Sequence, residues 1–548
     1  MNYEYLADLI FPNIDKSIED YRKIYPAREE GLVVTRFAPS PTGFIHIGNF
    51  EQAVIDYVVA KSKGGIFFLR NEDTDKAREN KEAVDVIMKT LEYYGIVPDE
   101  YQYHDKIVGN YGPYIQSQRK EIYHAFIKHF IKIGRAYPCF CSKEDLDGLR
   151  EKQTGDKVRT GYYGEYASCR NLSIEEVVEK IENGEEYIIR FKSMGDPNKR
   201  FVFKDLVKGD IEFPENDLDY VIMKVDGLPT YHFAHLVDDY LMGTTHVIRG
   251  EEWLSSVPFH VELFRTLGVK LPKYIHSPLI MKKDGDKVRK ISKRKDPEAS
   301  MSYYKEHGFP FDAVIESLMT IINSNYEEWH TANSDKSYLD FDYSPKKMSS
   351  SGALYDLDKL INISKNIISK MSKEELCEKS YEWASEYSNE LVNLIDKDKN
   401  YYMDILNIER EQKKPRKDIA KYDEIIENIW YMYDDLFLDR DKVYEFQKIT
   451  DESEIKLILD TYIDKYFDVS DKEVWFNNIK LLCDELGYAS NMKEYKENPD
   501  MFKGNVADVS TVLRVALTTK SMTPDLYEIM RLLGKDRVSK RFKEFKIN

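Results

Sequence analysis

The sequence contains few cysteines: five among 548 residues, Cys139, Cys141, Cys169, Cys377 and Cys483. They are too few and too scattered for a disulfide framework. No apolar run approaches the ~18 residues that a membrane-spanning helix needs. The first 30 residues are acidic and aromatic and lack the pattern of a signal peptide. These absences predict a cytoplasmic protein that does not engage a membrane.

An excess of positive charge is also missing, because 80 basic and 97 acidic side chains give a net charge of −17. This balance argues against non-specific binding of nucleic acids. It does not exclude a specific nucleic-acid partner, since local patches set the field at a binding face. Hydrophobic residues make up 42% of the chain, which is ample for globular packing. At about 100–200 residues per domain, the length predicts three to five domains.

Residues 31–75 read as a strand, a loop, a helix and a second strand. Residues 31–37 and 66–70 are short apolar runs, and the apolar positions between residues 50 and 58 follow helical spacing. Two such strands joined by a helix predict a right-handed βαβ crossover. In such sheets ligands bind beyond the carboxyl ends of the strands.

The loop before this helix has the chemistry of a phosphate site. Gly43 and Gly48 allow the backbone to approach a ligand closely. The helix begins at the same edge, where unpaired N–H groups and the helix dipole favour an anion. His46 can donate a hydrogen bond to a phosphate oxygen. An ordinary surface turn with a solvated histidine is the alternative.

Three stretches resemble the opening of class I glutamyl-tRNA synthetases of the bacterial type: RFAPSPTG at 36–43, HIGN at 46–49 and RNEDTD at 70–75. Asn49 stands where many class I synthetases have a second histidine. Because Asn can still donate a hydrogen bond, we expect a modified contact with ATP and a working site.

The resemblance implies an α/β fold: a class I, Rossmann-like parallel sheet with an inserted α+β acceptor-binding domain, followed by an all-α C-terminal half. The expected parts are an N-terminal extension (residues 1–30), the first half of the catalytic domain (31–124), the acceptor-binding insertion (125–228), the second half of the catalytic domain (229–330), a stem-contact domain (331–400) and a helical anticodon-binding domain (401–548).

The amino-acid pocket is expected around residues 228–253. Tyr231 and His235 are spaced to share one helical face. Arg249 ends a predicted strand, where its guanidinium can grip a carboxylate through two hydrogen bonds. A buried cation there should favour glutamate over neutral glutamine. The glutamate-binding residues that the resemblance implies are Arg36, Ala38, Ser40, Glu72, Tyr231, His235 and Arg249.

Three segments resemble the second nucleotide signature of the class, at residues 290–294, 347–351 and 370–374. We choose the first, KISKR, because residues 281–295 hold eight Lys/Arg and two Asp in a predicted loop, a net charge of +6. Ser372 and Glu375 instead form a capping-box pattern for a helix. Residues 347–351 precede a segment that resembles the stem-contact region.

The resemblance then implies the nucleotide site. ATP would be bound with Mg²⁺ on the leaving pyrophosphate, and the catalytic residues would be His46, Asn49, Lys290 and Lys293. The full set of expected ATP contacts is Pro41, Thr42, Gly43, His46, Gly48, Asn49, Glu252, Lys290, Ile291, Ser292, Lys293 and Arg294.

A zinc site is one interpretation of Cys139, Cys141 and Cys169, which resemble the metal ligands of some family members. Zinc takes four ligands, and Tyr166 or Glu165 would supply the fourth. Reduced thiols without a metal are the other interpretation.

The expected function is ATP-dependent attachment of L-glutamate to the 3′-terminal adenosine of tRNA(Glu) by a monomer. Two alternatives stay open: an enzyme that also charges tRNA(Gln), and a decayed tRNA-binding paralogue. A small-molecule nucleotidyltransferase would not need the long helical C-terminal part, and a shorter glutamyl-transferring paralogue lacks the anticodon-binding half that this length supplies.

Overall fold

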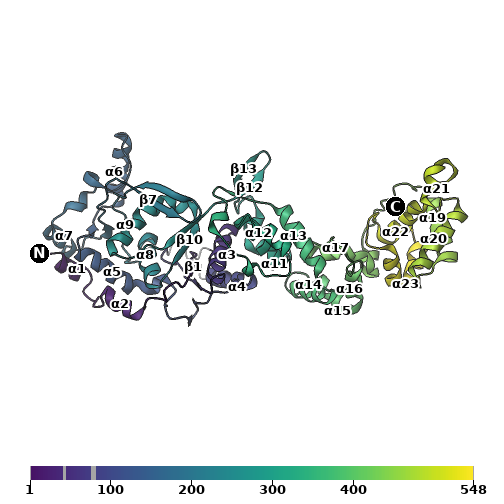
Figure 1. The fold of residues 1–548 in the computed structure, drawn as a ribbon, viewed down its shortest axis with the longest axis horizontal. Coiled ribbons are helices and arrows are strands. Elements are labelled where there is room, and N and C mark those ends of the chain that lie inside the picture. Colours follow the sequence, from purple (N-terminus) through teal and green to yellow (C-terminus); the bar gives the residue numbers. More distant parts are fainter. Residues whose placement is uncertain (1, 41–42, 44, 76–81, 547–548) are drawn as a thin grey trace. The chain divides into compact units, whose positions relative to one another are not determined.

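A computed structural model describes residues 2–40, 43, 45–75 and 82–546 of the chain. These residues form two compact units (Figure 1). The first comprises Met1–Tyr304 and Ile315–Asp356, and the second comprises Lys305–Val314 and Leu357–Asn548. Within the described ranges, none of the helices has both the length and the apolar composition that crossing a membrane requires.

The predicted crossover is present in the first unit. Strands β1 (Val34–Phe37) and β2 (Ile66–Leu69) pair in parallel, and helix α3 (Ile47–Lys61) connects them. The helix buries its apolar face, including Phe50. Gly65, after the helix, packs tightly against the backbone of Val33. A Cβ added at Gly65 would lie 2.2 Å from the carbonyl oxygen of Val33. The strand–helix–strand prediction is therefore confirmed.

A second sheet contains β10 (His246–Gly250), β11 (Lys273–Ser277), β7 (Arg200–Asp205) and β8 (Gly209–Pro214) in this order. Strands β10 and β11 are parallel, and Arg249 is the register partner of His276. The predicted strand that ends near Arg249 is confirmed.

The basic segment at residues 281–295 is not a simple loop. Strands β12 (Ile280–Asp284) and β13 (Lys287–Lys290) form an antiparallel hairpin, and β12 also pairs with β14 (Ala353–Tyr355). The turn at Gly285 has a φ of 61°, which glycine adopts without strain. In Figure 1 the hairpin projects from the ribbon of the first unit.

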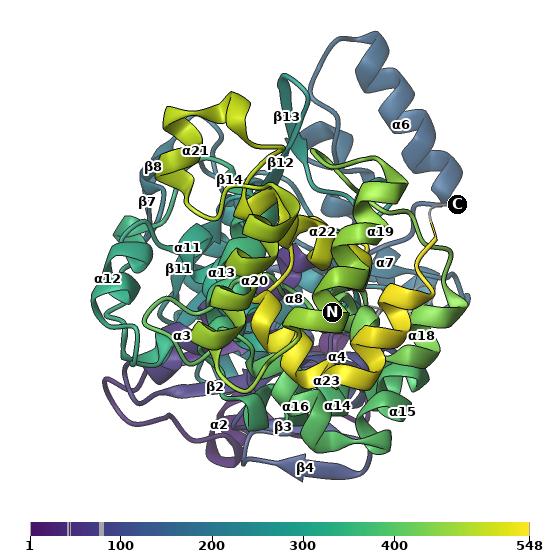
Figure 2. The ribbon, with the colours of Figure 1, turned by 90° about the vertical axis from the view of Figure 1, so that its right-hand side faces the viewer.

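The part of the chain between α5 (Lys120–Lys132) and α8 (Tyr231–Leu241), called the inserted part below, has an antiparallel sheet of β5 (Ala136–Cys139), β6 (Ile188–Phe191) and β9 (Val221–Met223). Helix α6 (Lys143–Gly155) begins at a capping box formed by Ser142 and extends away from this sheet (Figure 2).

The N-terminal extension is helical. Helices α1 (Tyr3–Ile10) and α2 (Ile18–Ile24) pack against α5 (Lys120–Lys132). Lys128 Nζ donates to the carbonyl oxygens of Phe11 and Ile14 at 3.0 and 2.8 Å, which fixes the link between the two helices.

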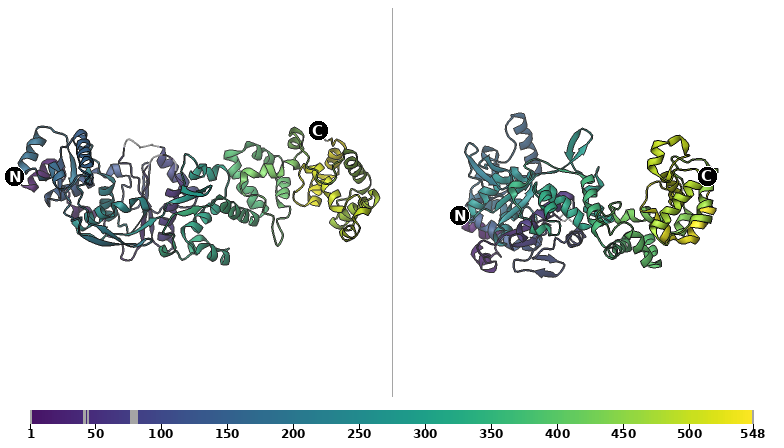
Figure 3. Two further views of the ribbon diagram at one scale, coloured as in Figure 1. Left: turned by 90° about the horizontal axis from the view of Figure 1, so that it is seen from above. Right: turned by 45° about the vertical axis from the view of Figure 1, so that its right-hand side comes forward.

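The second unit is built from helices around one apolar core (Figure 3). Ser372 caps α14 (Lys373–Tyr387) by accepting from Glu375 N at 3.1 Å, which confirms the predicted helix start but forms only one of the two bonds of a capping box. Helix α20 (Lys472–Leu486) buries Trp475, Ile479 and Leu482 along one face. The helical C-terminal half of the predicted fold class is confirmed.

The remaining strands and helices are β3 (Tyr101–Tyr103), β4 (Lys106–Val108), α4 (Ala83–Tyr93), α7 (Ile174–Glu182), α8 (Tyr231–Leu241), α9 (Val257–Leu267), α10 (Met301–Glu306), α11 (Phe311–Ile322), α12 (Tyr326–Ala332), α13 (Leu357–Lys370), α15 (Asn389–Lys397), α16 (Lys399–Asn407), α17 (Ile425–Ile429), α18 (Asp434–Asp439), α19 (Glu452–Thr461), α21 (Met492–Glu497), α22 (Val506–Thr518) and α23 (Leu526–Lys543).

Candidate active site

His46 lies where two distant stretches of the chain meet. It forms an isolated antiparallel bridge with Ser300, and Met301 N donates to Ile45 O at 3.1 Å. As the N-cap of α3, His46 accepts from Gly48 N through Nδ1 at 3.1 Å. Its proton is therefore on Nε2, which remains a donor.

Two lysines of the KISKR segment affect the pKa of His46. Burial lowers the pKa of His46 below 6.5, and the positive charges of Lys290 and Lys293 lower it further. The structure therefore brings the HIGN and KISKR stretches to one place and keeps His46 neutral near pH 7. A neutral donor beside two cations suits a phosphate group.

The loop after β13 is held by Asp296, which is buried. Its carboxylate accepts from Ser292 N at 2.9 Å and from both terminal nitrogens of Arg289 at 2.6 and 2.8 Å. Ile291 is also buried and donates its N–H to Ile280 O at 3.1 Å. Asp296 and Ile291 are thus buried anchors of the loop, whereas the side chains of Lys290, Lys293 and Arg294 are exposed.

Arg249 is buried, with 4% of its surface exposed, and its partners are neutral. Its Nε donates to His276 Nε2 at 2.9 Å, and its Nη1 lies 3.1 Å from His260 Nδ1. Nη2 reaches Trp253 O at 3.5 Å. Within the part of the chain that the structure describes, no carboxylate forms an ion pair with Arg249. Its charge is thus available to a ligand.

Arg36 differs from Arg249, because the carboxylate of Asp239 offsets its charge. Arg36 Nε lies 3.3 Å from Asp239 Oδ1, and Arg70 Nη1 donates to the same oxygen at 2.8 Å. Burial opposes ionisation of Asp239, but the charges of Arg70 and Arg36 hold its pKa well below 3.8. Glu72 accepts from Arg70 at 2.9 Å, and burial raises its pKa above 4.5. Arg36, Arg70, Asp239 and Glu72 thus belong to one buried charged group, which also includes Asp238 at 3.8 Å from Arg70 Nε.

Helix α8 carries the predicted pair. The rings of Tyr231 and His235 are stacked with centroids 6.1 Å apart, which confirms their shared face. Tyr231 also contacts Trp253, with ring centroids 4.4 Å apart. His235 is fully buried, and its Nε2 forms a hydrogen bond with Tyr274 Oη at 2.8 Å. The expected contact between His235 and glutamate stays a prediction.

The other predicted site residues fall into two groups. Pro41 and Thr42 lie outside the described residues. The remaining ones are partly or fully exposed beside the carboxyl ends of β1 and β10 or at the start of α3: Ala38, Ser40, Gly43, Gly48, Asn49 and Glu252.

Sequence reasoning gave no role to Arg70, Asp239, His260 or His276. Arg70 and Asp239 stand inside the quoted motifs, so their charge was a usable signal. His260 and His276 had none, because only the register of β10 with β11 and the packing of α9 bring them to Arg249.

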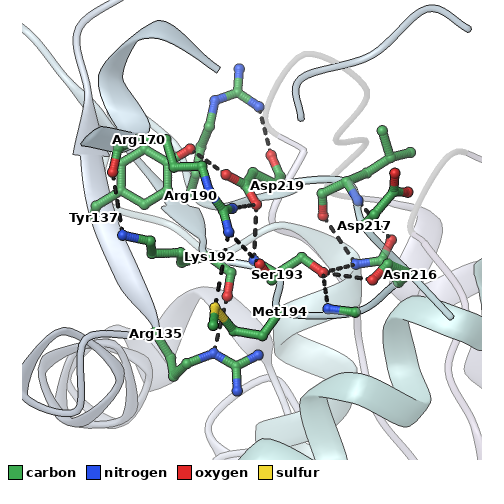
Figure 4. Close-up of polar contacts among 12 residues, drawn as sticks. Arg135, Tyr137, Arg170, Arg190, Lys192, Ser193, Met194, Asn216, Asp217 and Asp219 are labelled. Carbon is green, nitrogen blue, oxygen red and sulfur yellow. Dashed lines mark hydrogen bonds and ion pairs between the residues drawn. The ribbon is translucent and has the colours of Figure 1, made fainter. Parts of the chain in front are cut away.

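Ser193, Asn216 and Asp219 belong to a polar network of the inserted part (Figure 4). Asp219 accepts from Ser193 N at 2.8 Å and pairs with Arg170. Glu262 on α9 accepts from Ser193 Oγ at 2.7 Å and from Asn216 Nδ2 at 2.9 Å. The helix that carries His260 is thereby fixed to the insertion.

The three predicted metal-binding thiols are together. The Sγ atoms of Cys139, Cys141 and Cys169 lie within 4.8 Å of one another, and among the described His, Cys, Asp and Glu side chains this group does not include Glu165. Two hydroxyls contact the thiols: Tyr162 Oη lies 3.5 Å from Cys139 and 3.3 Å from Cys141, and Ser168 Oγ lies 3.3 Å from Cys141 alone. Tyr162 was not among the fourth ligands expected from the sequence.

These donors fit zinc. Cys141 and Cys169 are 3.7 Å apart, close to the ~3.8 Å between two thiolates on a tetrahedral Zn²⁺ with ~2.3 Å bonds. Hydrogen bonds from the Cys141 and Cys169 thiols lower the pKa of Cys139 far below its usual 9.0. A thiolate is the form that binds a metal.

The crossover, the insertion, the basic hairpin and the helical second unit together define a class I aminoacyl-tRNA synthetase. The family described as "tRNA synthetases class I (E and Q), catalytic domain" matches residues 32–360, and an anticodon binding domain matches residues 381–546.

The relatives narrow this class. The glutamate–tRNA ligase of Clostridium perfringens (strain SM101 / Type A) is 50% identical, with 100% of each chain covered. That of Acetivibrio thermocellus is 48% identical over 99% of each chain. A solved glutamate tRNA ligase from Elizabethkingia meningosepticum CCUG26117, in complex with its amino acid, aligns with a TM-score of 0.75 and 26% identity, covering 93% of this chain and 98% of that one. The chain belongs to the glutamate–tRNA ligase family.

Proposed function

We propose that this protein activates L-glutamate with ATP and transfers it to the 3′-terminal adenosine of tRNA(Glu). The observation that carries the choice of glutamate is the buried Arg249, whose partners among the described residues are all neutral. A side-chain carboxylate would pair with this cation. Glutamine has no charge to offer and would leave the guanidinium buried and uncompensated.

The nucleotide half of the site is formed by His46 with Lys290 and Lys293. His46 Nε2–H donates to a phosphate oxygen, and the lysines offset the negative charge that develops during transfer. The start of α3 adds its backbone N–H groups. When bound, Mg²⁺ supplies charge neutralisation on the leaving pyrophosphate.

The first step needs no protein nucleophile. The α-carboxylate of glutamate attacks the α-phosphorus of ATP in line, which expels pyrophosphate and leaves glutamyl-adenylate. The terminal 2′-hydroxyl of the tRNA then takes the glutamyl group and releases AMP. The protein therefore contributes positioning and charge stabilisation. In this account the acidic group of Glu72 with Ser40 holds the α-ammonium, and Arg36 lies beside the substrate carboxylates.

We also propose that Cys139, Cys141 and Cys169 bind a structural zinc ion, with the Tyr162 hydroxyl as the fourth donor. The short distances among these four atoms and the lowered pKa of Cys139 support it. The site lies at the base of α6 in the inserted part, where it would stabilise the fold.

The direct test is aminoacylation with purified acceptors. We expect glutamate, and neither glutamine nor aspartate, to be attached to tRNA(Glu). A parallel reaction with tRNA(Gln) separates a strict enzyme from one that charges both acceptors. Exchange of pyrophosphate into ATP, with and without tRNA, isolates the first step. Tight tRNA(Glu) binding with no exchange would instead identify a decayed, tRNA-binding paralogue.

A further inference from the structure

A continuous chain of buried hydrogen bonds passes through Arg249. Asp205 Oδ2 lies 2.7 Å from His276 Nδ1, and His276 Nε2 accepts from Arg249 Nε at 2.9 Å. On the other side, Arg249 Nη1 is 3.1 Å from His260 Nδ1, and His260 Nε2 is 2.9 Å from His232 Nδ1. Asp205, His276 and His260 are each at most 2% exposed.

The donors and acceptors in this chain fix one proton arrangement. Arginine can only donate, so the facing nitrogens of His276 and His260 must offer lone pairs. The Asp205 carboxylate can only accept, so His276 carries its proton on Nδ1. His260 correspondingly carries its proton on Nε2, where it donates to His232. Both imidazoles are neutral in this state.

The surroundings favour the neutral forms. His276 faces Asp205 at the end of β7, Arg249 on β10 and Lys208 just after β7. Burial lowers its pKa below 6.5, and Asp205 opposes this shift only in part. His260 faces His232 and His235 on α8 as well as Arg249 and His276. Burial lowers its pKa well below 6.5, and these neighbours add to the shift.

The choice of imidazoles has a consequence for the charge of Arg249. Arg36 and Arg70 are oriented by the carboxylate of Asp239, which also offsets their charge. A neutral imidazole orients a guanidinium without offsetting it. Two such acceptors leave Arg249 aligned and still attractive to an anion.

We propose that His276 and His260 are positioning residues that hold Arg249 for the side-chain carboxylate of glutamate, and that Asp205 sets the His276 tautomer on which this depends. The inference deepens the proposed function and rests on the glutamate-binding role of Arg249. Protonation of His276 would replace its lone pair with an N–H that faces the guanidinium, so glutamate binding should weaken in acid.

Two substitutions of His276 separate positioning from packing. In His276→Gln the amide N–H can still reach Asp205 and the carbonyl oxygen can still accept from Arg249, without any titration. His276→Leu fills space but removes the acceptor. In exchange assays we expect His276→Leu to raise the KM for glutamate about tenfold, with kcat and the KM for ATP within about twofold of wild type. His276→Gln should stay within about threefold for all three.

Asp205→Asn tests the tautomer. Asp205 Oδ1 accepts from Val207 N and Lys208 N at 2.9 and 2.8 Å, so the oxygen of an asparagine must stay there. Its NH₂ group then faces His276 Nδ1 and forces the proton onto Nε2, against Arg249. We expect the KM for glutamate to rise as in His276→Leu, again without an equal change for ATP.

The pH dependence of the KM for glutamate separates positioning by His276 from packing, because a change in packing alone would not alter it. Between about pH 8 and about pH 5, the KM for glutamate of wild type should rise more steeply than that of His276→Gln, because only the histidine can be protonated. Melting temperatures at each pH identify losses that come from unfolding. If His276→Leu does not fold, Asp205→Asn and His276→Gln decide the question.

Arg249→Gln distinguishes a failure of the proposed glutamate-binding role of Arg249 from a failure of the positioning role of His276. If it leaves the KM for glutamate unchanged, the proposed role of Arg249 fails and the positioning role fails with it. If it raises this KM and adding His276→Leu has no further effect, the two residues act together, as expected. The positioning role alone is overturned if Arg249→Gln weakens glutamate binding while both His276→Leu and Asp205→Asn bind glutamate like wild type. It is also overturned if His276→Gln is as impaired as His276→Leu.

Discussion

His46 and Ser300 are joined by an antiparallel β-bridge, although one follows β1 and the other follows the KISKR segment. The bridge brings the start of α3 to the basic hairpin, and the lowered pKa of His46 reflects the nearby charges of Lys290 and Lys293. The account of ATP binding depends on this meeting of distant segments.

Lys293→Ala should lower pyrophosphate exchange by about 10²–10³-fold, because one cation that stabilises the transferring phosphate is lost. Binding of tRNA, measured separately by filter retention, should change little. The matched control is Lys283→Ala, an exposed lysine of the same hairpin, which should exchange at the wild-type rate. Exchange that survives intact in Lys293→Ala would remove this lysine from the site.

Glu51 makes stability depend on pH. It is buried in α3, its Oε1 has no hydrogen-bond partner among the described residues, and burial raises its pKa from 4.5 to about 8. Between these values the folded form holds a proton that the unfolded form releases, so stability falls as pH rises through this window. The cost is up to about 1.4 kcal/mol per pH unit.

Glu51→Gln should therefore gain stability relative to wild type as the pH is raised from about 5 to about 8. Thermal unfolding at both values measures the difference. Glu212→Gln, on the exposed surface of β8, should show a constant difference from wild type. A constant difference for Glu51→Gln as well would mean that Glu51 is ionised in the folded protein.

Asp239→Asn should destabilise the first unit by about 3–5 kcal/mol, because Arg36 and Arg70 would lose the carboxylate that balances them in the interior. The control is Asp342→Asn, whose pair with Lys63 is exposed and should contribute less than about 1 kcal/mol. Comparable melting temperatures for the two variants would contradict the ion-pair account.

The thiol cluster should hold one zinc ion per chain, detectable by elemental analysis of the purified protein. Cys169→Ser should lose the metal and Tyr162→Phe should hold it more weakly, whereas Cys483→Ser in the second unit should retain it. Strong chelation should lower the melting temperature of wild type but not of Cys169→Ser. Metal-free protein with an unchanged melting temperature would leave three reduced thiols as the correct interpretation.

Much of the fold could be predicted from local pattern. The short apolar runs at β1 and β2, the helical spacing of α3 and the Ser372 cap depend on short stretches of sequence, and the structure contains each of them. The hairpin at residues 281–290 was missed because its basic, polar residues resemble a loop. Its first strand, β12, pairs with β14, which is distant in sequence.

The site could be predicted where a motif placed its residues and could not where packing did. Arg249 lies near the end of a strand that the sequence predicts. The two histidines that hold it come from β11 and α9, and nothing near them in the sequence indicates a partner. The same holds for Tyr162, which reaches the thiols from a segment full of tyrosines.

The central claim is that Arg249 selects glutamate, and the most direct measurement is the kinetics of pyrophosphate exchange by Arg249→Gln. The account predicts that kcat/KM for glutamate falls by at least about 10²-fold while the KM for ATP stays within about twofold. Equal losses for glutamate and ATP, or unchanged use of glutamate, would contradict it.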